Sequence, residues 1–188
     1  MPRRHVVFSH GKESGPWGIK IAAMAEIARV EGYEADSVDY RGIDDPHDRM
    51  TRLLSYCRDL RGDLVLVGSS LGGHVATAAS TLLRAKGLFL LAPAFYVPGH
   101  EHETPKPSGC PLTIVHGWRD DVVPVENSLR YAREHGATLH LVDGDHRLIE
   151  QVPFINYLFE YFLVSLDLPH LQRKPARKQD GQEAAVAR

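Results

Sequence analysis

Short runs of apolar residues alternate along this chain with longer segments in which apolar residues recur every three or four positions. The clearest run is Leu64-Val65-Leu66-Val67. An uninterrupted apolar stretch of this kind is typical of a strand buried on both faces of a parallel sheet. In the segment before it, apolar side chains stand at i, i+3, i+4 and i+7, as Met50, Leu53, Leu54 and Cys57. That spacing predicts one face of a helix.

The alternation predicts repeated βα units and therefore an α/β fold with a parallel sheet. We expect strands near residues 5–9, 34–39, 63–68, 87–92, 111–116 and 138–143. We expect helices at 17–31, 47–60, 71–85, 126–135 and 149–166. Helices on both faces of about six parallel strands would give a three-layer α/β/α sandwich.

Two segments are expected to be irregular. Residues 93–111 contain five prolines and two glycines, which predicts a long loop after a strand. Residues 169–188 are rich in basic and polar side chains and poor in apolar ones, which predicts a disordered tail. The remaining residues, 1–168, are expected to form one domain, since domains usually hold ~100 to 200 residues.

Composition limits the classes of partner that we expect this protein to bind. The 22 basic and 24 acidic residues give a formal net charge of −2, which favours neither nucleic acid nor an anionic membrane as a partner. The apolar stretch Val6-Val7-Phe8 is too short for a signal peptide, and the two cysteines form neither a disulfide framework nor a zinc motif. We expect a cytoplasmic protein with a small-molecule substrate, and predict no oligomeric state.

The strongest chemical signal follows the buried run. There the pentapeptide Gly68-Ser69-Ser70-Leu71-Gly72 lies between a predicted strand and a predicted helix. G-x-S-x-G in this setting is typical of a tight bend that exposes one serine between two glycines. Ser70 is the candidate nucleophile, and the backbone N–H of Leu71 would face an oxyanion. The alternatives are a helix N-cap role for Ser70 and, with the bend displaced by one residue, Ser69 as the reactive group.

A serine hydroxyl needs a general base, and the base works best when a third group orients it. Asp120 comes just after the strand expected at 111–116, and His146 comes just after the last predicted strand. Ser70, Asp120 and His146 thus follow different strands of one sheet, in the order Ser, Asp, His. This arrangement predicts acyl transfer through a serine nucleophile.

Rivals exist for the acid and the base. Asp121 adjoins Asp120, and Asp145 adjoins the histidine, where it could serve as a loop hydrogen-bond acceptor. Three other histidines could compete as the base, but they follow the wrong strands or lie on the helix, so we expect them to pack or to support the site: His10, His74 and His116.

Four motifs together resemble small bacterial alpha/beta hydrolases that lack a lid domain. They are V-V-F-S-H-G at 6–11, G-S-S-L-G-G at 68–73, H-G-W-R-D-D-V-V-P at 116–124 and G-D-H-R at 144–147. The resemblance covers roughly residues 5–166 and implies a minimal alpha/beta-hydrolase fold with serine esterase or thioesterase activity. It also implies that the acid is Asp120 and that the second oxyanion donor is the backbone of Lys12. Unlike larger relatives, the chain has no room for leading antiparallel strands or for a cap between 93 and 110.

We therefore expect hydrolysis of a small carboxylic ester or thioester, without cofactor or metal. Short loops around the site favour a short acyl chain or an exposed scissile bond. Four aromatic residues on these loops could supply apolar walls for substrate binding: Trp17, Phe95, Tyr96 and Trp118.

Other functions remain as alternatives. A peptidase, amidase or lactone hydrolase would use the same groups, and a binding protein could keep the fold without turnover. A dinucleotide-binding domain is disfavoured because G-S-S-L-G-G lacks the G-x-G-x-x-G spacing. His100-Glu101-His102-Glu103 offers ligand types that zinc accepts, but one loop without further ligands favours a solvent-facing segment.

Overall fold

The computed structural model describes residues 3–98 and 101–168 of the chain. Six strands form one sheet, and every neighbouring pair is parallel, which confirms the expected α/β class. The strands are β1 (Arg4–Ser9), β2 (Glu34–Val38), β3 (Asp63–Ser69), β4 (Gly87–Leu91), β5 (Leu112–Gly117) and β6 (Thr138–Val142). The helices are α1 (Ile19–Val30), α2 (Pro46–Cys57), α3 (Leu71–Ser80), α4 (Val125–His135) and α5 (Val152–Ser165), with a 3-10 turn, η1, at Glu101–Glu103.

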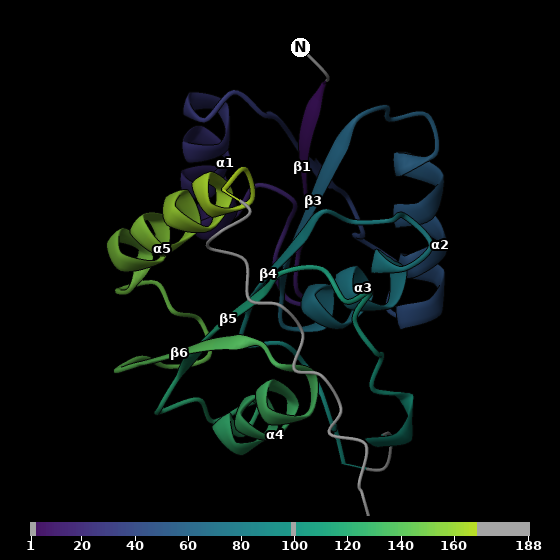
Figure 1. Ribbon diagram of the computed structural model, residues 1–188. Coiled ribbons are helices and arrows are strands. Elements are labelled where there is room, and N and C mark those ends of the chain that lie inside the picture. The colour runs from purple at the N-terminus through teal and green to yellow at the C-terminus, as the bar shows by residue number, and fades with distance from the viewer. Residues whose placement is uncertain (1–2, 99–100, 169–188) are drawn as a thin grey trace, which may run out of the picture.

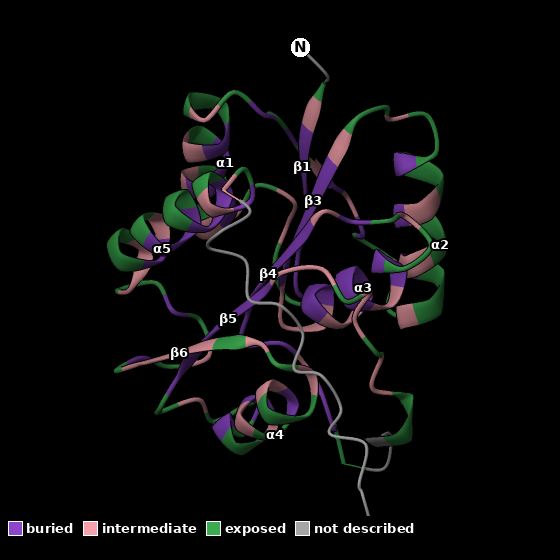
Figure 2. Ribbon diagram, in the orientation of Figure 1, coloured by how far each residue is buried: buried purple, intermediate pink, exposed green. Residues whose placement is uncertain are grey.

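The helices form two layers, one on each face of the sheet. Helices α1 and α5 lie together on one face, and α2, α3 and α4 cover the other (Figure 1). Strand β3 shows why its sequence is apolar at every position, since Val65 and Val67 enter the core under α1 and α5 while Leu64 and Leu66 enter the core under the other helices. Figure 2 shows the central strands buried along most of their length. The three-layer sandwich is confirmed.

The order of the strands in the sheet determines where a ligand site is expected. The order is β2-β1-β3-β4-β5-β6, so the chain leaves β1 toward one edge of the sheet, returns to β3 on the other side, and then continues outward. In open α/β sheets this reversal point, at the carboxyl ends of the strands, is where ligands bind. The loops after β1 and β3 therefore lie side by side, and the loops after β5 and β6 open on the same edge.

Local sequence explains the helix boundaries. Asp45 precedes α2, and its Oδ1 accepts the backbone N–H groups of His47 and Asp48 at 2.9 and 3.0 Å, with Pro46 in the first turn. Helix α3 is shorter than the expected 71–85, and that boundary was wrong. After Ser80 the chain turns, with Arg84 in the left-handed region at φ 52° and the Ala85 N–H bonded to the Ser80 carbonyl.

The segment between β4 and β5 follows the expectation of an irregular connection. Within its described residues, the 3-10 turn η1 is the sole regular element, and no cap domain is inserted there. The tail predicted at 169–188 lies outside the described residues. Across residues 3–98 and 101–168, no helix has both the length and the apolar character needed to cross a bilayer.

Candidate active site

Ser70 stands at a sharp turn between β3 and α3. Its backbone has φ 53° and ψ −122°, a strained conformation for a residue other than glycine. The turn is held by two backbone bonds, from the Ser70 N–H to the Leu91 carbonyl at 2.9 Å and from the Ala94 N–H to the Ser70 carbonyl at 3.0 Å. Strain at one partly buried serine, enforced by the neighbouring chain, is typical of a nucleophile elbow.

The two glycines of the motif are required by close approach of the backbone. A Cβ on Gly72 would lie 1.9 Å from the carbonyl oxygen of Ser9, and a Cβ on Gly68 would lie 2.5 Å from that of Gly72. Both distances are far below van der Waals contact. Glycine here lets α3 press against the ends of β1 and β3, which fixes the position of Ser70.

The structure brings the three predicted residues into one chain of hydrogen bonds. Nε2 of His146 lies 3.0 Å from Oγ of Ser70, and Nδ1 of His146 lies 2.7 Å from Oδ2 of Asp120. The carboxylate accepts, so Nδ1 carries the proton and Nε2 is free to accept from the serine hydroxyl. This is the tautomer that a general base needs.

Asp120, rather than Asp121, faces the histidine. Its side chain is fully buried, whereas Asp121 is exposed. Oδ1 of Asp120 accepts the N–H groups of Val122 and Val123 at 2.9 and 2.7 Å. Burial alone would raise the pKa of Asp120, but these bonds and the one from His146 outweigh it and keep the pKa below its usual value. The acid therefore remains a carboxylate at neutral pH.

The loop that carries His146 is shaped by the residue before it. Oδ1 of Asp145 accepts the N–H groups of Arg147 and Leu148 at 3.0 and 2.9 Å. Leu148 takes a left-handed conformation at φ 54° and is fully buried. Asp145 thus closes the turn around the histidine and is not placed to serve as its orienting acid.

The loop after β1 lies beside the serine and is built on His10. A Cβ on Gly11 would lie 3.4 Å from that of Ser70. Nε2 of His10 accepts the Tyr40 N–H at 3.0 Å, so Nδ1 carries the proton and donates to the Gly11 carbonyl at 2.7 Å. Burial lowers the pKa of His10, which keeps this arrangement neutral. The histidine therefore holds the loop in place, and among the described residues no hydrogen bond joins it to Ser70.

The two residues predicted as oxyanion donors, Leu71 and Lys12, lie on the elbow and on this loop. Leu71 opens α3, where backbone N–H groups have no helical partner and carry partial positive charge. Among the described residues, neither the Leu71 N–H nor the Lys12 N–H donates to another group. The fully buried Arg49 donates from Nη1 to the His10 carbonyl at 3.2 Å, which stabilises the loop after β1.

Of the four aromatic residues predicted to bind substrate, two are exposed and two are buried. Trp118 is 56 % exposed beside Asp120, and Trp17 is also exposed, with its ring 5.9 Å from the Arg29 guanidinium on α1. Phe95 is instead fully buried and stacks on Tyr131 with 3.9 Å between ring centroids. Tyr96 is also buried, and its hydroxyl donates to Oε2 of Glu134 at 2.5 Å.

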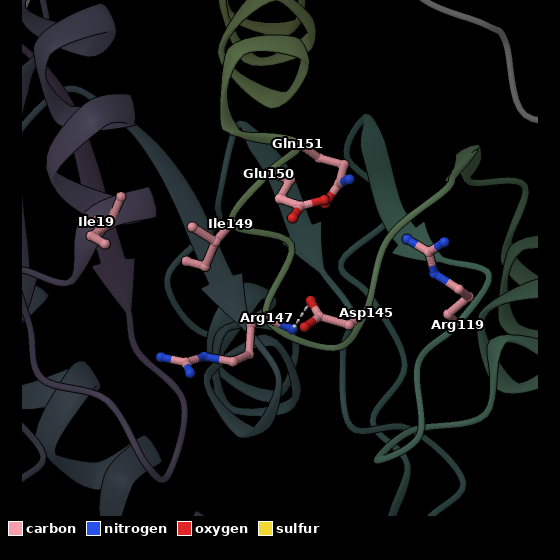
Figure 3. Close-up of a pocket in the computed structure, with 7 residues that line it drawn as sticks. All are labelled: Ile19, Arg119, Asp145, Arg147, Ile149, Glu150 and Gln151. Carbon is pink, nitrogen blue, oxygen red and sulfur yellow. Dashed lines mark hydrogen bonds between the residues drawn. The ribbon is translucent and has the colours of Figure 1, made fainter.

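A cavity of about 400 Å³ opens beside the histidine loop (Figure 3). Figure 3 shows Ile149 directed toward Ile19 at the start of α1. None of the four predicted wall aromatics lines it. The lining residues are Ile19, Arg119, Asp145, Arg147, Ile149, Glu150 and Gln151.

Two polar contacts near the site go beyond what the sequence predicted, although His116 was expected to pack or to support the site. Lys20, in the first turn of α1, points inward and donates to Oγ of Ser69 at 3.3 Å. Burial lowers the pKa of Lys20 to about 8, with Asp145 opposing the shift. The second contact joins His116 to Asp120, with 3.0 Å between Nε2 and Oδ2. Their i, i+4 spacing was the available signal.

Among the described residues, the side chains that could together ligate a metal ion lie on α2 and at its N-cap. The ligand atoms of Asp45, His47 and Asp48 lie within 4.8 Å of one another, but all three residues are exposed and Asp45 already caps α2. The predicted segment at 100–103 lies partly outside the described residues; within it, His102 and Glu103 pair at 3.7 Å.

Comparison with known proteins agrees with this geometry. The sequence pattern of the alpha/beta hydrolase family matches residues 6–176, so the chain belongs to that family. It is similar to a solved Xanthomonas campestris protein of the alpha/beta hydrolase superfamily, with 33 % identity, TM-score 0.80, and coverage of 88 % of this chain and 99 % of that one. A second Xanthomonas campestris structure, described as a serine hydrolase without lid, shares the fold at 18 % identity and TM-score 0.73, over 91 % and 84 % of the two chains.

A curated relative carries a more specific name. The mouse protein named palmitoyl-protein thioesterase ABHD10, mitochondrial, is 25 % identical over 78 % of this chain and 70 % of its own length. The resemblance noted from the four motifs is thus confirmed as family membership, and the family supports hydrolase activity.

Proposed function

We propose that this chain is a serine hydrolase that cleaves small carboxylic esters or thioesters through an acyl-enzyme intermediate. The observation that carries the proposal is the hydrogen-bonded chain from Ser70 through His146 to Asp120, at 3.0 and 2.7 Å. Serine–histidine–aspartate contacts of this length serve no evident packing need. Membership of the alpha/beta hydrolase family supports the same reaction class.

In the proposed mechanism, Oγ of Ser70 attacks the carbonyl carbon while Nε2 of His146 takes the hydroxyl proton. The negative charge that develops on the carbonyl oxygen is held by the backbone N–H groups of Leu71 and Lys12. Collapse breaks the C–O or C–S bond, and the leaving alcohol or thiol takes the proton from Nε2. Water then attacks the acyl-enzyme by the same steps and releases the acid and free Ser70.

The carboxylate of Asp120 acts through the histidine. It remains bonded to Nδ1 while Nε2 gains and loses a proton, so it holds the ring in one orientation and stabilises the imidazolium. Because Asp120 is fully buried, water screens this interaction little.

Thioester substrates are favoured by the names of the mouse and human relatives, both called palmitoyl-protein thioesterases, at 25 % and 27 % identity. A short or exposed acyl group is favoured by the loops of the described residues, which insert no cap above Ser70. The two arguments together propose a small or accessible thioester or ester. Peptide, amide and lactone substrates are the alternatives on the same triad.

The remaining expectations stay proposals. A non-catalytic binding protein would have no need of three aligned groups, which favours turnover. The formal net charge of −2 favours neither nucleic-acid nor membrane partners, and the proposed mechanism uses no cofactor. We propose a cytoplasmic location; the mitochondrial names of the relatives concern those proteins. The domain limits 1–168 are likewise proposed.

The test is a substrate panel. Purified wild-type protein and Ser70→Ala are compared on p-nitrophenyl esters of two to sixteen carbons, on the matching acyl thioesters, and on peptide and lactone substrates. Turnover of an ester or thioester that is lost in Ser70→Ala supports the proposal. Turnover that Ser70→Ala retains, or turnover of peptides alone, would count against it.

A further inference from the structure

The carboxylate of Asp120 lies between two imidazole rings. Oδ2 is 2.7 Å from Nδ1 of His146 on one side and 3.0 Å from Nε2 of His116 on the other. Oδ1 accepts the Val122 and Val123 N–H groups, so both carboxylate oxygens have polar partners. A buried carboxylate side chain held in this way cannot rotate without breaking several of these contacts.

The proton on His116 can be assigned from its neighbours. Nε2 is hydrogen-bonded to the Val123 carbonyl oxygen at 3.0 Å and lies 3.0 Å from Oδ2 of Asp120, so both neighbours are acceptors and Nε2 carries a proton. Nδ1 lies 2.7 Å from Oγ of Ser128, whose hydroxyl then donates to it. Each ring nitrogen therefore has a hydrogen-bond partner of the right kind.

His116 is a neutral donor. Its side chain is fully buried, and burial lowers the pKa of His116 against the opposing effects of the Val123 carbonyl and Asp120. A second imidazolium would compete with His146 for the charge on the carboxylate. A neutral ring places a polar N–H beside the carboxylate and leaves that charge to act on His146.

The ring is also held by rigid elements. His116 is near the end of β5 in the sheet, and Ser128 lies in the first turns of α4, where it is fully buried. Asp120 itself is on the loop between these elements. The histidine thus ties a loop residue to the strand and the helix on either side of it.

We propose that His116 is a positioning residue, which fixes Oδ2 of Asp120 through the 3.0 Å contact with its Nε2–H so that the carboxylate stays aligned with Nδ1 of His146. This inference rests on the proposed function, since it assigns a part in the same reaction. Among the described residues no hydrogen bond or ion pair joins His116 to Ser70, and it acts through Asp120. A displacement of about 1 Å at a group of this kind can lower turnover on the order of 100-fold.

The sharpest test uses two amides of different length. His116→Gln places a side-chain N–H near the position of Nε2, whereas His116→Asn is one methylene shorter and reaches only the Nδ1 position beside Ser128. Gln is expected to keep kcat on p-nitrophenyl butyrate within about 3-fold of wild type. Asn is expected to lower kcat by about 10-fold or more, with KM within about 2-fold.

A second readout does not depend on substrate. The Nδ1 proton of His146 should give a low-field NMR signal while it is bonded to Asp120. We expect the signal in wild type and His116→Gln, and expect it to broaden through solvent exchange in His116→Asn. If the Asn variant does not fold, His116→Met replaces it, with the same expected losses.

The control is His5→Asn, which removes another buried histidine at the opposite, amino end of the sheet, where Nε2 contacts the Arg61 carbonyl at 3.2 Å. It should lower stability without changing kcat or the His146 signal. Equal kcat and an equal signal in His116→Asn and His116→Gln would overturn the inference. A wild-type protein without esterase or thioesterase activity would overturn the proposed function instead, and the NMR comparison would still decide the role of His116.

Discussion

The imidazole of His146 lies 3.0 Å from the hydroxyl of Ser70, although the two residues are 76 positions apart in the sequence. One follows β6 and the other follows β3, and they meet because all six strands point the same way and end at one edge of the sheet. If the contact is the base–nucleophile pair of a hydrolase, its removal has large and specific effects.

Ser70→Ala and His146→Ala are each expected to lower kcat by about 10³- to 10⁶-fold, because the nucleophile or its base is lost. The double variant should be little worse than either single one, since the residues act as a unit. Steady-state kinetics on the best substrate of the panel measure this. Multiplicative losses in the double variant would contradict a shared step.

Replacement of the acid should discriminate between the adjacent aspartates. Asp120→Asn removes the charge that orients and stabilises the imidazolium, and kcat is expected to fall by about 10²- to 10⁴-fold, less than for Ser70→Ala. Asp121 is exposed, so Asp121→Asn should stay within about 2-fold of wild type. A larger loss of kcat in Asp121→Asn than in Asp120→Asn would mean that the acid is Asp121 and that the assignment to Asp120 is wrong.

Gly72→Ala should destabilise the folded protein. Its Cβ would lie 1.9 Å from the Ser9 carbonyl oxygen, and an overlap of this kind in packed backbone lowers the free energy of unfolding by about 1 to 3 kcal/mol or more. Gly15→Ala is the matched control, because a Cβ there meets nothing within 4 Å. Urea unfolding followed by circular dichroism compares the two, and equal midpoints would argue against the close packing of α3 on β1.

Lys20 makes stability depend on pH in a defined direction. Burial lowers the pKa of Lys20 to about 8 in the folded protein, below its usual value of 10.5, so between these values the unfolded chain binds more protons and stability rises with pH. Lys20→Met should raise the free energy of unfolding at pH 7 by about 1 to 3 kcal/mol. The advantage over wild type should shrink as the pH approaches 10.5. An advantage that is constant from pH 7 to 10 would place the lysine in solvent.

Substrate preference should respond to Trp118. It is exposed beside Asp120, and Trp118→Ala is expected to change the ratio of kcat/KM between butyrate and octanoate esters by about 3-fold or more, because an apolar wall would be lost. Tyr161→Ala, an exposed aromatic on α5, should leave the ratio unchanged. No change in either variant would remove Trp118 from the binding surface.

The sequence predicted the sheet well because burial in parallel strands leaves a local trace. The run at 64–67 is apolar at every position since both faces of β3 are covered, and G-x-S-x-G marks the turn after it without any knowledge of distant contacts. The loops after β5 and β6 could be placed at the same edge from strand order alone, which is why Ser70, Asp120 and His146 were named correctly as neighbours.

What the sequence did not reveal depends on contacts between distant segments. Phe95 and Tyr96 follow β4 toward the site edge, but Tyr96 turns at φ 48° and both rings pack on Tyr131 of α4. Lys20 has the sequence position of a surface residue at the start of an amphipathic helix, and its inward direction depends on Ser69 across the layer. The tilt of a loop or a helix relative to its neighbours sets such contacts, and hydrophobic periodicity carries no information on it.

The most direct measurement is covalent labelling of the wild-type protein with a fluorophosphonate, followed by mass spectrometry of the modified peptide. The account predicts one adduct, on Ser70, formed slowly or not at all in His146→Ala and absent from Ser70→Ala. An adduct on Ser69 or another residue, or labelling that persists unchanged when Ser70 is replaced, would contradict a nucleophile at the end of β3.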